Sequence, residues 1–176
     1  SGHFGESSAV SAFYLKNVQG LDGNSVDPDI KGAHVHAWGA GATIDLGDSG
    51  LNIDGDFIQT RGNRDLGHAN LWTAGLNYGK VDLNKPGSFT LGVHYVRADA
   101  GAYLLGNSAL DMTDQLEYGW DNGTGVKFWV AKAGVAVQKN VELDAYYNFG
   151  AKAFDRYDDS TKDPANTWGV ELNYAF

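Results

Sequence analysis

The residues best suited to metal chemistry are a pair of histidines and a group of aspartates. His34 and His36 are one residue apart, so on a strand they share a face, a spacing compatible with a surface metal site. Polar residues beside a membrane interface would show the same spacing, and we favour that interpretation. The aspartates, Asp155, Asp158, Asp159 and Asp163, match no defined calcium loop and indicate a solvated acidic loop. We predict no metal site and no cofactor.

No catalytic motif is present. The sequence contains no Gly-x-Ser-x-Gly, no phosphate-binding loop and no convincing triad, so we predict that the protein is not an enzyme. The absence of cysteine excludes a disulfide framework and a thiolate metal site. The net charge of -9 argues against a nucleic-acid partner, since binding phosphates requires a basic stripe.

The apolar residues recur with a period of two along almost the whole chain, which predicts strands. No apolar run approaches the roughly 18 residues of a transmembrane helix, but several predicted strands match the ~9–11 tilted residues that cross a bilayer. The polar residues 1–8 show no signal peptide, so we expect a mature form or a fragment. We predict eight strands, at residues 9–16, 31–46, 51–59, 69–81, 88–98, 125–138, 141–152 and 167–176.

The connections between these strands alternate in length. Short turns are expected at 47–50, 82–87 and 139–140, and long connections at 17–30, 60–68, 99–124 and 153–166. Long loops on one side and tight turns on the other are typical of outer-membrane barrels, in which the loops are extracellular and the turns periplasmic. An even number of strands then places both ends of the chain on the periplasmic side.

Each predicted strand has one apolar and one polar face. In 69–81, for example, Leu76 and Tyr78 alternate with Gly75 and Asn77. A soluble barrel or sandwich is the alternative, but the polar faces are rich in glycine rather than in Lys and Glu. Aromatic residues form two belts, as lipid–water interfaces select. Those toward the long connections are Trp38, Phe57, Trp72, Tyr95, Trp129, Tyr147 and Trp168, and those toward the short turns are Tyr78, Phe89, Tyr174 and Phe176.

The final segment, Trp168-Gly-Val-Glu-Leu-Asn-Tyr-Ala-Phe, resembles the last strand of bacterial outer-membrane β-barrel proteins. The resemblance implies an assembly signal, carried by Trp168, Tyr174 and Phe176, that the barrel-assembly machinery reads. The glycine-rich strands and the Asn-Tyr-Ala-Phe ending resemble the porins that diderm Firmicutes link to an S-layer-homology domain, although no such domain occurs in this sequence. Those porins have about twice as many strands, so this chain would be the C-terminal half of a barrel.

The fold class that we predict is therefore all-β, a transmembrane antiparallel up-and-down β-barrel. Eight strands closed alone would be filled by side chains, but many inward positions here are Gly or Ala. We favour one half of a barrel of about 16 strands. The expected protein partners are the remaining strands of that barrel or a homo-oligomer such as a trimer. The predicted pore-lining residues are Asp54, Asp56, His94, Lys132, Glu142, Asp144 and Glu171.

The long connection 99–124 could contain a short helix capped by Asn107 or Ser108. It could fold inward as a constriction loop or project outward as a lid, and both alternatives stay open. Its acidic residues are Asp111, Asp114, Glu117 and Asp121.

The function expected from these features is that of a porin in the outer membrane of a Gram-negative-type envelope. Ions and small hydrophilic solutes would diffuse passively through it, with surrounding outer-membrane lipids as partners. The alternatives are a closed small barrel with a structural, membrane-tethering or adhesive role, and an outer-membrane lipase or protease.

Overall fold

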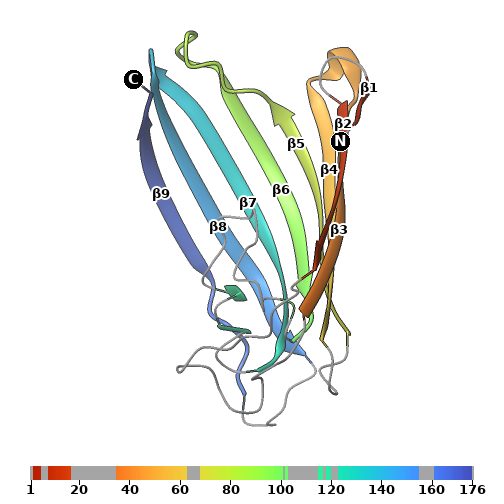
Figure 1. Cartoon of the computed structure of the whole chain (residues 1–176). Coiled ribbons are helices and arrows are strands. Elements are labelled where there is room, and N and C mark those ends of the chain that lie inside the picture. The colour runs from red at the N-terminus through yellow and green to blue at the C-terminus, as the bar shows by residue number, and fades with distance from the viewer. Residues whose placement is uncertain are drawn as a thin grey trace.

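The computed structural model describes residues 2–4, 8–16, 35–62, 68–100, 102, 115–116, 118–119, 123–154 and 161–175. In this part the chain forms one antiparallel sheet whose strands follow one another in chain order (Figure 1). None of its described helical residues form a helix long and apolar enough to cross a membrane. The strands are β1 (Gly2–Phe4), β2 (Ser8–Lys16), β3 (Val35–Asp45), β4 (Leu51–Gly62), β5 (His68–Gly79), β6 (Phe89–Ala98), β7 (Gly125–Gln138), β8 (Val141–Phe154) and β9 (Thr167–Tyr174).

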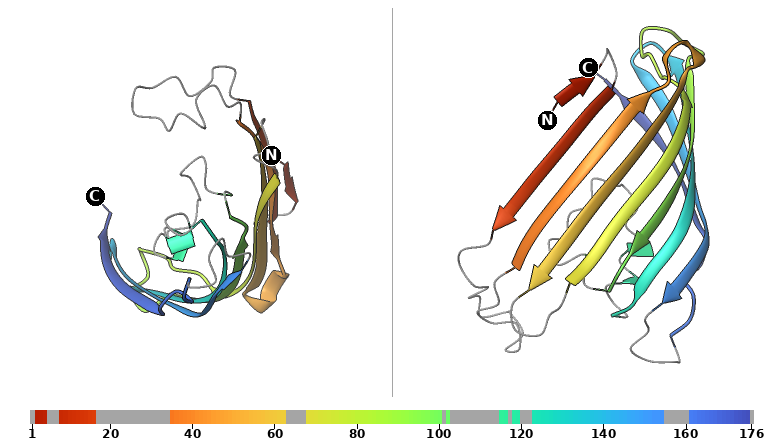
Figure 2. Two further views of the ribbon diagram at one scale, coloured as in Figure 1. Left: turned by 90° about the horizontal axis from the view of Figure 1, so that it is seen from below. Right: turned by 90° about the vertical axis from the view of Figure 1, so that its right-hand side faces the viewer.

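The predicted meander of eight strands is confirmed as β2 to β9. The sequence did not reveal β1, because its three residues are too few to show an alternating pattern. The described strands form an open, curved sheet and do not close into a barrel by themselves. Among the described residues β9 pairs with β8 alone and β1 with β2 alone, and Figure 2 shows the gap between these two edges.

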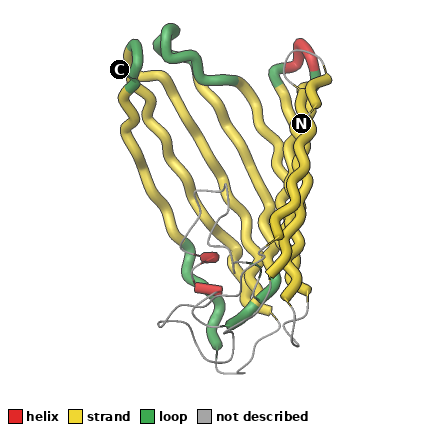
Figure 3. Tube along the Cα trace, viewed as in Figure 1, coloured by secondary structure: helices red, strands yellow, loops and turns green. Residues whose placement is uncertain are grey.

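The short turns gather at one end of the sheet, as the sequence predicts (Figure 3). The first contains a 3-10 turn at Gly47–Ser49, and the third places Asn140 at a φ of 60°, a left-handed conformation that Asn tolerates. β1 and the end of β9 lie at this same end, where the Ala175 N–H donates to the Asn140 carbonyl over 2.9 Å. Both described ends of the chain therefore lie at the end of the sheet with the short turns, as the even number of predicted strands implies.

The register joins side chains of one kind into two continuous faces. Leu76 lies opposite Ile53 and Val93, whereas its neighbour Gly75 lies opposite Asp54 and His94. Leu76, Ile53 and Val93 are all exposed to solvent, Leu76 by 44% and Val93 by 38%. Figure 2 shows the short helical segments in the hollow of the sheet. Leu116, from one of these segments, packs with Val130, which lies opposite His94. The polar face is thus the concave face, and the apolar face is the convex face.

The pairing of β7 with β8 has two irregularities of register, between Lys127 and Trp129 and between Ala136 and Gln138, and the first of them reverses this alternation along β8. Between the pairs Lys127–Lys152 and Trp129–Phe149, β8 contains one residue more than β7, and Gly150 has a φ of 63°. Such a bulge shifts every later side chain to the opposite face. As a result Ala151 is buried on the concave side and Lys152 is exposed on the convex side.

The bulge generates the first prediction. Gly150→Val should lower the free energy of unfolding by about 1–3 kcal/mol, because a β-branched residue is strained at positive φ. Urea unfolding of the refolded chain would measure this difference. Ala145→Val, at a position of β8 without positive φ, is the matched control and should cost less. Equal costs for the two variants would contradict the bulge.

Candidate functional site

The polar residues that the sequence singles out lie together on the concave face. Asp54 is opposite Gly75, which is opposite His94, and Lys132 lies between Gly92 and Tyr146. Asp144 pairs with Gly134 on one side and Glu171 on the other. The register therefore places all seven predicted lining residues on this face, which we call the polar band: Asp54, Asp56, His94, Lys132, Glu142, Asp144 and Glu171.

A hydrogen-bonded network links three strands of the polar band. The Asn77 amide nitrogen donates to the Asn52 side-chain oxygen over 2.9 Å and to a carboxylate oxygen of Asp54. The Asn77 oxygen must then face His94, whose Nε2 lies 2.9 Å away and acts as the donor. The His94 Nδ1 is 3.4 Å from the other Asp54 oxygen. Only 7% of His94 is exposed, so this network is rigidly held in the wall.

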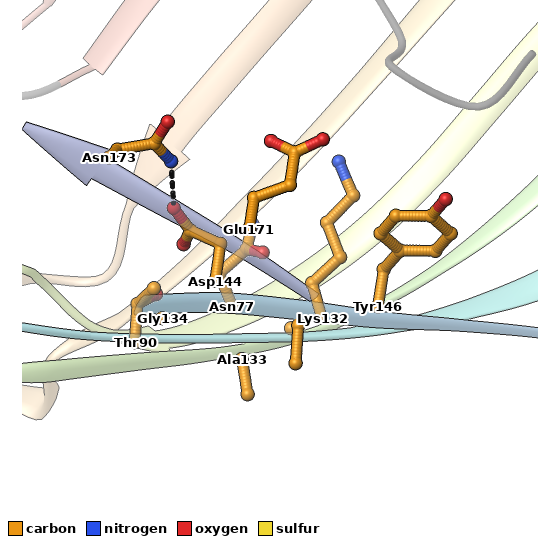
Figure 4. A pocket seen from close by; sticks show the side chains of 11 residues that line it. Asn77, Thr90, Lys132, Ala133, Gly134, Asp144, Tyr146, Glu171 and Asn173 are labelled. Atoms are coloured by element: carbon orange, nitrogen blue, oxygen red, sulfur yellow. Dashed lines mark hydrogen bonds between the residues drawn. The ribbon is translucent and has the colours of Figure 1, made fainter. Parts of the chain in front are cut away.

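Acidic side chains dominate the polar band nearer the short turns. Here a cavity of about 580 Å³ is bordered by Lys132, Asp144 and Glu171 (Figure 4). The Asn173 amide donates to Asp144 over 2.8 Å, whereas Lys132 and Glu171 extend away from the wall. Lys132 is the one Lys or Arg among the described strand residues of the concave face, so carboxylates set the sign of the local potential.

Glycine allows several of these side chains to lie flat against the wall. A Cβ at Gly75 would overlap the His94 ring, which covers this glycine from the neighbouring strand. The hollow in front of the wall is consequently wider than the size of the lining side chains suggests. The same arrangement pairs Gly41 with Asp56, Gly92 with Asn77, Gly134 with Asp144 and Gly169 with Tyr146.

The concave face is apolar at the end with the long connections, which sequence reasoning missed. Val96, Phe128 and Val130 are completely buried there and pack with Leu116 from the connection 99–124. The sequence does contain a signal of this apolar region at the start of β7. Between residues 125 and 130, apolar residues occupy both faces of the strand instead of alternating with polar ones.

Polar contacts hold the described residues of that connection in the hollow. Gln115, 1% exposed, donates through its amide to the Thr167 hydroxyl over 2.9 Å and accepts from the Asn148 amide over 2.8 Å. The Tyr118 hydroxyl donates to the Lys162 carbonyl over 2.6 Å. Gln115, Leu116 and Tyr118 thus lie on the concave side. The predicted constriction residues of the connection, Asp111, Asp114, Glu117 and Asp121, lie outside the described residues, as does most of the expected helix.

The convex face presents an aromatic belt toward the long connections. Ring centroids lie 5.1 Å apart for Trp38–Phe57 and for Trp72–Tyr95, and 5.0 Å apart for Tyr95–Trp129. Tyr147 continues the belt to Trp168, which lies directly opposite it. At the other end Tyr78 and Phe89 have centroids 6.1 Å apart.

The other residues that the sequence singles out lie outside the polar band. Trp168 is 74% exposed and Tyr174 is also exposed, both on the convex face. The His36 ring stacks on Tyr14 with centroids 6.5 Å apart, and an Asp163 oxygen accepts from Lys152 over 2.8 Å. The described residues contain no cluster of three potential metal ligands. His34, Asp155, Asp158, Asp159 and Phe176 lie outside the described residues.

Comparison with known proteins gives no family for this chain. The sequence matches no protein-family model, and no curated protein matches it either.

The close packing of His94 over Gly75 generates a second prediction. Gly75→Ala should cost about 1–3 kcal/mol of unfolding free energy, because the ring must leave Asp54 and Asn77. In a His94→Ala background the same substitution should cost little, because nothing then covers position 75. Urea unfolding of the four proteins in this double-mutant cycle would give the coupling energy. Additive costs would show that the ring does not occupy this position.

Proposed function

We propose that this chain forms part of the wall of a β-barrel pore in a bacterial outer membrane. Ions and small hydrophilic solutes would pass through it by passive diffusion. The observation that carries the proposal is the sorting of side chains between the two faces. Every carboxylate in the described strands is on the concave face, and the large apolar residues of β3 to β9 that are exposed are on the convex face.

The convex face suits lipid rather than water. A protein in water rarely exposes a continuous apolar surface of several hundred Å². Here exposed apolar residues such as Ile53, Leu76, Val93 and Leu143 run across neighbouring strands. Aromatic belts flank them on both sides, and the eight long strands contain 8 to 14 residues. Tilted strands of about 9–11 residues cross the hydrocarbon core.

Membrane insertion requires that the sheet be closed. The outer edges of β1 and β9 have no strand partner among the described residues, and an unpaired backbone edge is very costly in lipid. The proposal therefore includes further strands, from the rest of the same protein or from other copies of the chain, in a barrel of about 16. Assembly by the barrel-assembly machinery belongs to the same proposal, with Trp168 and Tyr174 exposed on the edge strand.

The position of Gln115 and Leu116 favours a constriction formed by the connection 99–124. Both residues are buried on the concave side, so this described part of the connection occupies part of the hollow. The same observation supports a second candidate, a closed small barrel with a structural, tethering or adhesive role, because an apolar cluster could fill a narrow interior. Conductance measurements separate the two, since a filled barrel passes no current.

Ion preference is the third prediction. The intact barrel should pass cations over anions modestly at low ionic strength, because carboxylates outnumber Lys132 on the concave face, and salt should weaken the preference. Reversal potentials across a planar bilayer with a KCl gradient would measure it. Lys132→Gln should strengthen the preference, and Asp144→Asn with Glu171→Gln should weaken it.

The matched control is Lys127→Gln, because Lys127 lies on the convex face of the same strand. It should leave the reversal potential unchanged. Anion preference in the intact barrel would refute the predicted selectivity, and a complete lack of conductance would favour the structural alternative.

Lipid exposure is the fourth prediction. Val93→Arg, on the convex face, should cost ~2–4 kcal/mol of folding free energy in a bilayer. Thr90→Arg, on the concave face of the same strand, should cost much less, because that side chain borders the cavity. Unfolding from lipid vesicles would compare them. Similar costs would mean that lipid does not cover the convex face.

A further inference from the structure

The basic residues of the strands are sorted as strictly as the acidic ones. All six carboxylates in the described strands are on the concave face: Asp45, Asp54, Asp56, Glu142, Asp144 and Glu171. Of the six Lys and Arg residues in these strands, Lys132 lies on the concave face and the other five lie on the convex face. These five all lie near the long connections: Lys16, Arg61, Arg97, Lys127 and Lys152.

The five convex cations, together with two histidines, form two rows of residues that lie opposite one another on neighbouring strands. We call these two rows together the basic band. Across β2 to β5 the row reads Lys16, His36, Arg61 and His68, each opposite the next. Across β6 to β8 it reads Arg97, Lys127 and Lys152.

The basic band borders the aromatic belt. His36 is two residues from Trp38, and Lys127 is two residues from Trp129, which is about 6.6 Å along a strand. The convex surface therefore changes from apolar to aromatic to basic toward the long connections.

In the second row Arg97, Lys127 and Lys152 lie directly opposite one another, and like charges in this arrangement destabilise a sheet, so an anion that neutralises them would be stabilising. The described residues supply it only in part. The Arg97 Nε is 3.9 Å from Asp99, and the Lys152 Nζ is 2.8 Å from Asp163. Within the described part of the chain Lys16, Arg61 and Lys127 have no carboxylate within ion-pair distance.

We propose that the basic band binds the phosphate groups of membrane lipids in the leaflet next to the long connections. Guanidinium and ammonium groups are the side chains that recognise phosphate. A lipid whose acyl chains lie along Leu91 and Val93 would place its headgroup beyond the aromatic belt, at the level of the band. The continuous apolar surface below the cations is what favours a lipid over free phosphate. This inference rests on the proposed membrane location.

The test uses the intact barrel that contains this chain, inserted into phosphatidylcholine nanodiscs, with diphosphoryl lipid A or phosphatidylglycerol added as the probe. Native mass spectrometry or tryptophan emission would give the apparent affinity. The triple variant Lys16→Gln, Arg61→Gln, Lys127→Gln should bind the probe far more weakly, by roughly fivefold for each cation removed. Added salt should weaken binding by the wild-type protein.

The pair Lys127→Gln and Lys132→Gln provides the matched comparison, because both remove one positive charge from β7 but on opposite faces. Only Lys127→Gln should weaken lipid binding. Equal effects of the two variants, or unchanged binding by the triple variant, would overturn the inference. If inorganic phosphate at the same concentration as the lipid probe displaced the probe completely, the basic band would be a site for free phosphate. The proposal that it binds lipid would then be wrong.

Two further outcomes separate this inference from the proposed function. If the intact wild-type barrel does not insert into neutral bilayers, both the proposed function and the proposed lipid binding are wrong. If it inserts but shows no preference for phosphate-bearing lipids, only the basic band loses its proposed role.

Discussion

Backbone hydrogen bonding between neighbouring strands is the constraint on which the rest of this structure depends. Every strand from β2 to β8 has an antiparallel partner on both sides, so each residue has a defined opposite residue. Because successive side chains point to opposite faces, one register determines the content of both surfaces. Leu76 shares its face with Ile53 and Val93 for the same reason that Asp54 shares its face with His94.

The wall that results is thin and electrically asymmetric. Its concave face contains carboxylates and the Asp54–Asn77–His94 network, and its convex face contains apolar residues bordered by cations. Glycines such as Gly75 let lining side chains fold back onto the sheet, which preserves the space in front of them. In the pore that we propose, such a wall would attract counter-ions on its concave face and anionic headgroups on its convex face.

The hollow is shaped by two opposing features. In the membrane location that we propose, the open edges at β1 and β9 would require more strands and therefore a wider enclosure. The buried cluster of Leu116 with Val96 and Phe128 instead fills part of the concave face near the long connections. A constriction at one end of a wide pore satisfies both features, whereas a small closed barrel satisfies only the second.

The sequence by itself determined the eight long strands, the positions of the short turns and the face of most side chains, because alternation and turn preferences are local properties. Only the tertiary structure decided features that depend on cross-strand register. The extra residue at Gly150 sends Lys152 to the convex face, and Gln115 finds Asn148, 33 residues away in the sequence. No local pattern encodes either result, because a bulge and a long-range hydrogen bond are selected by the packing of the strands around them.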